Sequence, residues 1–199
     1  NIIAPMLQLK GDQLPVSALP IDGSWPSGTS KFEKRNIAEH VPEWQEALCT
    51  QCGLCTLVCP HAAIRMKVFD PSETLNAPAS FKHVPAKIKG FENKHYSLQV
   101  AVEDCTGCDA CVNVCPVIEK NKLGLTSGKK AINMVPQLPI REQERANFAF
   151  FTTLGETSAE QVTGGIVNLK GSQLMQPLFE FSGACAGCGG TPYIKLLTQ

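Results

Sequence analysis

The chemistry that this sequence can do is concentrated in two copies of one cysteine pattern. In each copy, four cysteines follow the spacing C-x-x-C-x-x-C-x-x-x-C, and a proline comes directly after the fourth. The copies consist of Cys49, Cys52, Cys55 and Cys59, and of Cys105, Cys108, Cys111 and Cys115. This run is typical of the ligands of 4Fe-4S clusters, so two copies predict two clusters.

The spacing of the pattern explains how it could hold a cluster. Three cysteines at steps of three residues can wrap their sulfurs around one face of a cube, while the amides of the loop point at its inorganic sulfides. The fourth cysteine, one helical turn further on, is aimed away from that cube and ligates the other cluster in two-cluster ferredoxins. We therefore expect one cluster to be held by Cys49, Cys52, Cys55 and Cys115, and the other by Cys105, Cys108, Cys111 and Cys59.

Two other uses of cysteine fit this pattern less well. A disulfide framework is typical of short chains in oxidising compartments, and cysteines three residues apart in a row cannot all find partners in disulfide geometry. Zinc also binds Cys-x-x-Cys, but its four ligands come as two separated pairs rather than as a run of four that ends in proline. The pattern therefore favours iron-sulfur clusters over zinc.

The composition describes a chain of balanced charge. Its 199 residues are 43% hydrophobic, and 18 basic residues balance 18 acidic ones. This balance gives no reason to expect nucleic acid or a membrane as partner, and no apolar stretch approaches membrane-spanning length. Ten cysteines without a signal peptide indicate a reducing compartment. Because the sequence begins at Asn1 and ends at Gln199 inside a helix-like pattern, we expect it to be a fragment of a longer polypeptide.

The order of the segments predicts an α+β fold, in which a two-cluster bacterial ferredoxin-like module is flanked by irregular linkers. The predicted segments are a connector over residues 1–40, the module over 41–140, a helix and linker over 141–176, and the start of a further domain over 177–199. The pattern of the residues also predicts some of the elements. These are a short helix or a loop over 32–37, a turn into a strand over 61–66, strands over 96–102 and 129–135, a helix over 141–151, and a linker over 152–176.

The stretch between the cysteine copies is longer than a minimal two-cluster ferredoxin uses, so residues 67–95 are predicted to be an insertion. Its basic side chains are Lys82, Lys87, Lys89 and Lys94. They suggest either a docking surface for an acidic electron carrier or a solvated loop packed on a neighbouring domain. His61, two residues after Cys59, could tune the neighbouring cluster through a hydrogen bond or could cap and pack.

A third cysteine pair, Cys185 and Cys188, lies in a glycine-rich stretch near the end of the sequence. Glycines let the backbone approach a bulky ligand closely. Alone, such a pair fits a redox dithiol, a zinc site or an iron-sulfur cluster. Its position after a two-cluster module favours a third cluster.

Several stretches closely resemble the pyruvate:ferredoxin oxidoreductase (pyruvate synthase) family, across essentially the whole chain. The most specific stretch is Phe181-Ser-Gly-Ala-Cys-Ala-Gly-Cys-Gly189, in combination with the two cysteine copies. The other resembling stretches are residues 14–18, 31–38, 59–65 and 104–108. One departure is Gly190, where the family usually has glutamate.

The resemblance implies a large homodimeric enzyme that oxidatively decarboxylates pyruvate on thiamine diphosphate, with Mg, and forms acetyl-CoA and CO2. Its electrons would leave through three 4Fe-4S clusters to ferredoxin or flavodoxin. Cys185 and Cys188 would be two ligands of the third cluster, with their partners beyond Gln199, and residues 177–199 would begin the thiamine-diphosphate domain. The compartment would be the cytoplasm, or the hydrogenosome of an anaerobic protist.

Other functions stay open on the sequence alone. The chain could be a ferredoxin-type carrier without enzyme activity, a subunit of another 2-oxoacid oxidoreductase, or part of a pyruvate enzyme fused to a flavin domain that reduces NADP. No Gly-Asp-Gly signature of thiamine diphosphate and no acid-base constellation occurs in the 199 residues. We therefore expect no catalytic residues here and no catalysis by this fragment alone.

Overall fold

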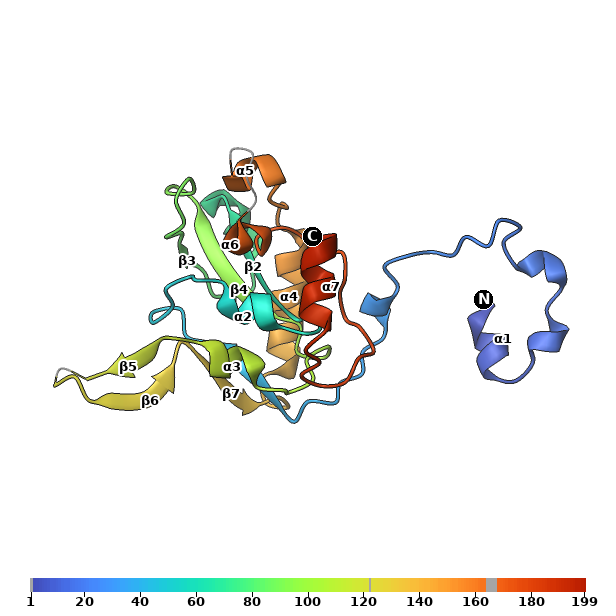
Figure 1. Ribbon diagram of the computed structural model, residues 1–199, viewed down its shortest axis with the longest axis horizontal. Helices are drawn as coiled ribbons and strands as arrows, with labels where there is room; N and C mark the ends of the chain where they lie inside the picture. The colour runs from blue at the N-terminus through green and yellow to red at the C-terminus, as the bar shows by residue number, and fades with distance from the viewer. Residues whose placement is uncertain (1, 122, 164–167) are drawn as a thin grey trace.

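Two short helices stand at the centre of the fold, each directly after one cysteine loop. In the computed structural model, which describes residues 2–121, 123–163 and 168–199, helix α2 spans Leu54–Val58 and helix α3 spans Ala110–Val114. Each helix begins after a residue with a left-handed backbone, Gly53 (φ 75°) or Asp109 (φ 66°), and ends at the fourth cysteine of its copy. The two helices pack against each other (Figure 1).

Two antiparallel strand pairs join the halves of the module. Strand β1 (His40–Trp44), before the first cysteine loop, pairs with β7 (Ile132–Pro136), after the second. Strand β2 (Ile64–Phe69), after the first copy, pairs with β4 (His95–Val100), before the second. The short strand β3 (Val84–Pro85) adds to the other edge of β4. Each half therefore gives one strand to each pair, so the two halves are joined into one module.

The main core lies where the two strand pairs meet. Tyr96 of β4, Met66 of β2 and Ile132 of β7 are among its largest fully buried side chains. Trp44 of β1 meets Tyr96 edge to face, with the ring centroids 5.7 Å apart. Such an aromatic pair adds about 0.5–1.5 kcal/mol beyond the burial of its area. The strand pairs thus share one core and fix the positions of the cysteine loops between them.

Helix α4 (Arg141–Thr153) follows the module and packs against β4, which confirms the predicted helix over residues 141–151. The strand predicted over 96–102 is also confirmed, as β4 (His95–Val100), although it ends two residues earlier. A second small apolar cluster joins the end of α4 to the end of β2. It consists of Phe69, Phe81, Phe151 and Leu154.

The predicted insertion, residues 67–95, is only partly a loop. Its first residues complete β2, where Lys67 is buried and its Nζ donates to the Leu154 carbonyl oxygen at 2.7 Å. A 3-10 helix, η4 (Pro71–Asn76), follows and starts at a capping box formed by Asp70 and Glu73. Strand β3 then brings the rest of the insertion back onto the sheet.

The predicted linker over residues 152–176 is not simply a linker. It contains helices α5 (Ala159–Thr163) and α6 (Leu169–Ser172), and Leu174 is buried in the main core. Burial of Leu174 returns the chain to the module, which glycine content alone did not predict. Two of the glycines that suggested a linker, at 164 and 165, lie outside the described residues.

The structure also decides two other predicted segments. Of the helix and the loop expected over residues 32–37, the structure has the loop, which follows one 3-10 turn, η3 (Ser30–Phe32), and the Ser30 hydroxyl donates to the Glu180 carbonyl oxygen. The strand expected over 129–135 begins only at Ile132 in β7. The residues before it form a separate hairpin of β5 (Ile118–Lys120) and β6 (Thr126–Lys130).

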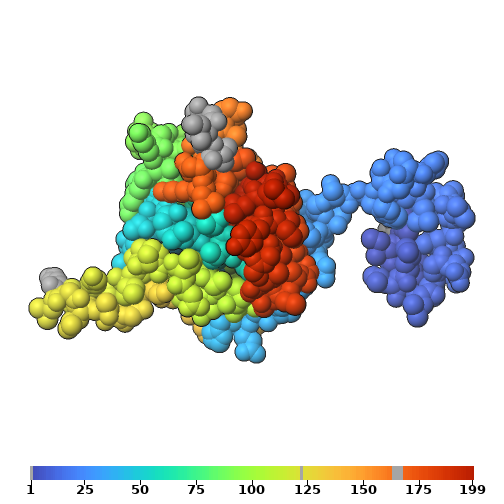
Figure 2. Space-filling model, in the orientation of Figure 1, coloured from blue at the N-terminus to red at the C-terminus, as the bar shows by residue number. Residues whose placement is uncertain are grey.

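The two ends of the chain are placed differently. An N-terminal arm with α1 (Ile3–Leu7) and the 3-10 turns η1 (Gly11–Gln13) and η2 (Val16–Ala18) extends away from the module (Figures 1 and 2). Helix α7 (Thr191–Thr198), at the other end, lies on the module beside α2. Within the three described ranges, every helix falls short of the length and apolarity that a membrane span requires.

Candidate iron-sulfur site

The two cysteine loops have the same backbone shape. Two residues of each loop, at matching positions, have positive φ angles: Gln51 (58°) and Gly53 (75°), and Gly107 (68°) and Asp109 (66°). These left-handed residues turn the loop amides inward. The Gln51 N–H donates to Cys49 Sγ at 3.3 Å, and the Gly107 N–H donates to Cys105 Sγ at 3.4 Å. Amides that point at sulfur are among the groups that stabilise and tune an iron-sulfur cluster.

Four cysteines surround a cavity at the first loop. We call them the first cysteine group: Cys49, Cys52, Cys55 and Cys115. The cavity encloses about 360 Å³ of atom-free space, part of it open to solvent, and Tyr96 and Ile132 belong to its apolar wall. Three of the cysteines come from the loop itself and from α2, and Cys115 comes from the end of α3.

A matching cavity lies at the second loop. Its second cysteine group comprises Cys59, Cys105, Cys108 and Cys111. The cavity encloses about 340 Å³ of atom-free space, again partly open to solvent, and His61 and Ile64 are part of its wall. Cys59 reaches this group from the end of α2.

Each group thus takes three cysteines from its own loop and the fourth from the other copy, which is the sharing that the sequence predicted. The packing of α2 against α3 is the physical cause, because each helix carries the last cysteine of its copy to the opposite loop. The structure brings together all eight cysteines of the two copies in this way. Iron ligation by these groups stays a prediction.

Burial makes the ionised form of these cysteines costly unless a cation is present. Burial raises the pKa of Cys105 from 9.0 to about 12, and the N–H of Gly107 opposes this only in part. Burial also raises the pKa of Cys55 well above 9.0, and the sulfurs around Cys55 add to that rise. Iron binds thiolates and supplies the positive charge that lets such thiols ionise. The donor set therefore fits two 4Fe-4S clusters.

A single metal ion would need a different arrangement of sulfurs. Zinc holds its thiolates about 2.3 Å from one point. Among the residues that the structure describes, no group of three or more His, Cys, Asp or Glu side chains converges closely enough to hold one ion. The sulfurs instead line the walls of cavities, and all ten cysteines are free of disulfides. This separation suits a cube-shaped cluster better than zinc.

The third cysteine pair lies next to the second cysteine group. Cys185 is exposed and Cys188 half-buried. Gly187, between them, has φ +71°, and a methyl group on it would lie 3.5 Å from the Cys108 Cβ. His61 Nδ1 lies 3.1 Å from the Ser182 carbonyl oxygen, so the histidine bridges the second cavity and the segment that leads to Cys185. Neither cysteine of the pair forms a disulfide.

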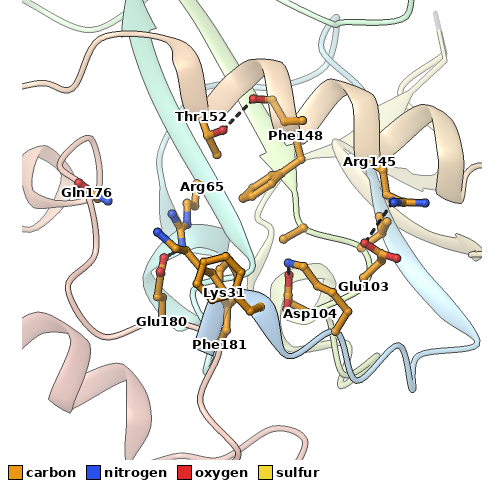
Figure 3. A pocket seen from close by; sticks show the side chains of 15 residues that line it. Lys31, Arg65, Glu103, Asp104, Arg145, Phe148, Thr152, Gln176, Glu180 and Phe181 are labelled. Carbon is orange, nitrogen blue, oxygen red and sulfur yellow. Dashed lines mark hydrogen bonds and ion pairs between the residues drawn. The ribbon is translucent and has the colours of Figure 1, made fainter. Parts of the chain in front are cut away.

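The segment before Cys185 is fixed to the module by charged and aromatic contacts. The Arg65 guanidinium pairs with the Glu180 carboxylate and lies over the Phe181 ring, 4.8 Å from its centroid. Figure 3 shows Arg65 between this segment and Phe148 of α4. The Lys34 ammonium also lies over the Phe181 ring, 5.0 Å from its centroid. These contacts give the third cysteine pair a defined place beside the second group.

Sequence reasoning missed two buried polar residues near the cysteine groups. Gln51 is fully buried, donates to the Pro85 carbonyl at 2.9 Å and accepts from the Lys87 N–H at 2.6 Å. Lys195 of α7 is 2% exposed and donates to the Thr56 carbonyl oxygen at 2.5 Å. Neither residue carries a local signal, since its partners are distant in sequence.

Comparisons with known families agree with this site. Residues 48–117, which contain both cysteine copies, match the family of the 4Fe-4S double cluster binding domain. Residues 1–38 match a second family, named EKR, which is a domain of unknown function. The chain therefore contains a 4Fe-4S double cluster binding domain within a mixed structure of helices and strands.

The whole chain is also similar to part of larger oxidoreductases. It is 53% identical over 199 residues to the pyruvate-flavodoxin oxidoreductase of Nostoc sp. and 45% identical over 199 residues to the pyruvate:ferredoxin oxidoreductase of Moorella thermoacetica. It is 43% identical over 202 residues to the mitochondrial pyruvate dehydrogenase [NADP(+)] of Euglena gracilis. These matches cover 100% of this chain but only 16%, 16% and 10% of the relatives. The resemblance to pyruvate:ferredoxin and pyruvate-flavodoxin oxidoreductases is thus confirmed for a segment of those enzymes.

Proposed function

We propose that this chain is the electron-transfer segment of an oxidoreductase that oxidatively decarboxylates pyruvate to acetyl-CoA and CO2, and that it holds two 4Fe-4S clusters in a bacterial-ferredoxin-like fold. The sharing of cysteines between the two groups carries the proposal, because this run of cysteines shares ligands in that way in two-cluster ferredoxins. The exchange of strands between the two halves supports the ferredoxin-like arrangement. Similarity over the whole chain supports the enzyme.

The residues of the chain hold three sites in a row. When bound, each 4Fe-4S cluster takes up and releases one electron. The loop of Cys185 and Cys188 lies against Cys108 of the second group. Helices α2 and α3 then join the second group to the first. We propose that this row runs from the pyruvate-oxidising part of the enzyme, through the second group, to the first group and the acceptor.

The insertion is the proposed place where ferredoxin or flavodoxin docks. Two of its lysines are neutralised, since Lys82 pairs with Glu43 at 3.4 Å and Lys94 pairs with Asp70 at 2.7 Å. Lys87 is exposed, and its Nζ donates to the Cys49 carbonyl oxygen at 3.1 Å, beside the first group. An acidic carrier attracted to this lysine would arrive next to the last site of the row.

The rest of the enzyme lies outside this chain. We propose that thiamine diphosphate and Mg bind elsewhere in the polypeptide, that Cys185 and Cys188 supply two ligands of a third cluster, and that the full protein is a homodimer. The names of the relatives support pyruvate as substrate and flavodoxin or ferredoxin as acceptor. Free buried cysteines and oxygen-sensitive clusters suit a reducing compartment such as the bacterial cytoplasm.

Anaerobic production of this chain with iron and sulfide tests the proposal. We expect about eight iron atoms and about as many labile sulfides per chain, because each cluster has four irons. The brown colour should bleach with dithionite, and the reduced chain should then reduce flavodoxin. Pyruvate alone should not reduce it, and the double variant Cys52→Ser, Cys108→Ser is the matched control. Stoichiometric zinc without labile sulfide would contradict the proposal, and about twelve irons per chain would contradict the assignment of Cys185 and Cys188 as a partial site.

A further inference from the structure

Lys195 is a buried lysine that the proposed function does not use. It lies on α7, seven residues after Cys188, and only 2% of its surface is exposed. Its Nζ donates to the Thr56 carbonyl oxygen at 2.5 Å and lies 3.3 Å from the Leu57 carbonyl oxygen. Both carbonyls belong to the last turn of α2, which α7 lies beside (Figure 1).

The ammonium contacts a helix that carries one cysteine of each group. Helix α2 contains Cys55 of the first group and ends at Cys59 of the second. Thr56 and Leu57, which hold Lys195, lie between these two cysteines in the sequence. One side chain from the C-terminal segment therefore reaches one of the two helices that both groups share.

The burial of Lys195 calls for a negative charge nearby. An unpaired ammonium is very costly in an apolar interior. Among the described residues, no carboxylate lies within ion-pair distance of Nζ, and the charged neighbour Arg65 repels it. The carbonyls at the end of α2 compensate only in part, because a helix end carries about half a charge. A 4Fe-4S cluster with four thiolates is anionic and would supply the missing charge.

The pKa of Lys195 agrees with this environment. Burial lowers it from 10.5 to about 8, and Cys59 and Cys55 act in the opposite direction. Cys59 has the larger of these two opposing effects on the pKa of Lys195.

We propose that Lys195 is a positioning residue that sets the reduction potentials of the two clusters: its ammonium stabilises their reduced, more negative forms and so raises both midpoint potentials. This inference rests on the proposed function, since it requires clusters in both groups. Reduction adds one electron and therefore one negative charge to a cluster, and a fixed cation favours the more negative state.

The test is a redox titration of the reconstituted chain, with dithionite as reductant and electron paramagnetic resonance as the readout. Lys195→Met should shift both midpoint potentials to more negative values. Lys195→Arg, which retains the charge, should stay close to the parent chain. Lys10→Met is the matched control, because it removes the same charge from an exposed lysine of the N-terminal arm.

Each outcome of this test decides the inference. Unchanged potentials in Lys195→Met, with both clusters present, would overturn it. Lys195→Gln keeps an N–H donor for the Thr56 carbonyl but lacks the positive charge. If the methionine variant binds few clusters, the glutamine variant distinguishes the effect of the lost charge from that of the lost hydrogen bond. Loss of the clusters from the Met and Gln variants but not from Arg would support a charge requirement, whereas equal loss from all three would contradict it. If the parent chain itself held no clusters, the proposed function would be wrong instead.

Discussion

Replacement of Gln51 by alanine should loosen the insertion over the first cysteine group. Gln51 is fully buried in the first cysteine loop, and its side chain links that loop to β3 and to the residue that follows Ala86. Its Nε2 donates to the Pro85 carbonyl oxygen at 2.9 Å, and its Oε1 accepts from the Lys87 N–H at 2.6 Å. Alanine removes both bonds and leaves the backbone of the loop in place.

The size of the effect follows from these two bonds. A typical intramolecular hydrogen bond contributes about 0.5–1.5 kcal/mol net, so their loss should lower the free energy of opening this region by about 1–3 kcal/mol. The open state should become about 5- to 150-fold more populated. Because the open state exposes the first cavity, oxygen should destroy a cluster there faster, by up to the same factor.

Oxygen-dependent bleaching and amide hydrogen exchange measure this effect. In Gln51→Ala, exchange of the Val84, Ala86 and Lys87 amides should accelerate, and the cluster of the first group should be lost before that of the second. Gln137→Ala is the matched control, since Gln137 is equally buried and also makes side-chain bonds in two directions, to Val102 and Arg141. Equal loss of the first cluster in both variants, or selective loss of the second in Gln51→Ala, would refute the reasoning.

Three further predictions concern the loops and the sheet. Gly53→Ala should destabilise the chain by about 1–2 kcal/mol in urea unfolding, because φ is +75° there and a Cβ would lie 3.1 Å from Met66 Cε; an unchanged midpoint would contradict this. Burial and the neighbouring His95 lower the pKa of His83 below 6.5, so the unfolded chain binds more protons and stability should fall as the pH drops below 6.5. The dependence of stability on pH should weaken in His83→Asn, and an unchanged dependence would exclude His83 as its source. Cys59→Ala should damage the cluster of the second group and spare that of the first, and the opposite pattern would show that each copy closes on itself.

The sequence predicted the parts of the site that depend on local spacing. The cysteine runs predicted the sharing of Cys59 and Cys115, because a helix of one turn or more fixes where the fourth cysteine points. Alternation predicted β4, and the mixture of charges and aromatics predicted α4. Each of these signals lies within about ten residues of chain.

The features that were not predicted depend on contacts between distant segments. The glycines of residues 152–176 predicted a linker. Leu174 is nevertheless buried in the main core, because the chain returns to the module after α6. Gln51 and Lys195 are ordinary polar residues in sequence, and their partners lie 34 and 139 residues away. Tertiary packing decides their roles, and no local pattern carries that information.

Anomalous diffraction at the iron edge, from crystals of the anaerobically reconstituted chain, tests the central claim most directly. Two strong peaks are expected, one enclosed by Cys49, Cys52, Cys55 and Cys115 and the other by Cys59, Cys105, Cys108 and Cys111. Peaks that were each enclosed by the four cysteines of a single copy would contradict the sharing of ligands. A signal at the zinc edge and none at the iron edge would contradict the iron-sulfur site itself.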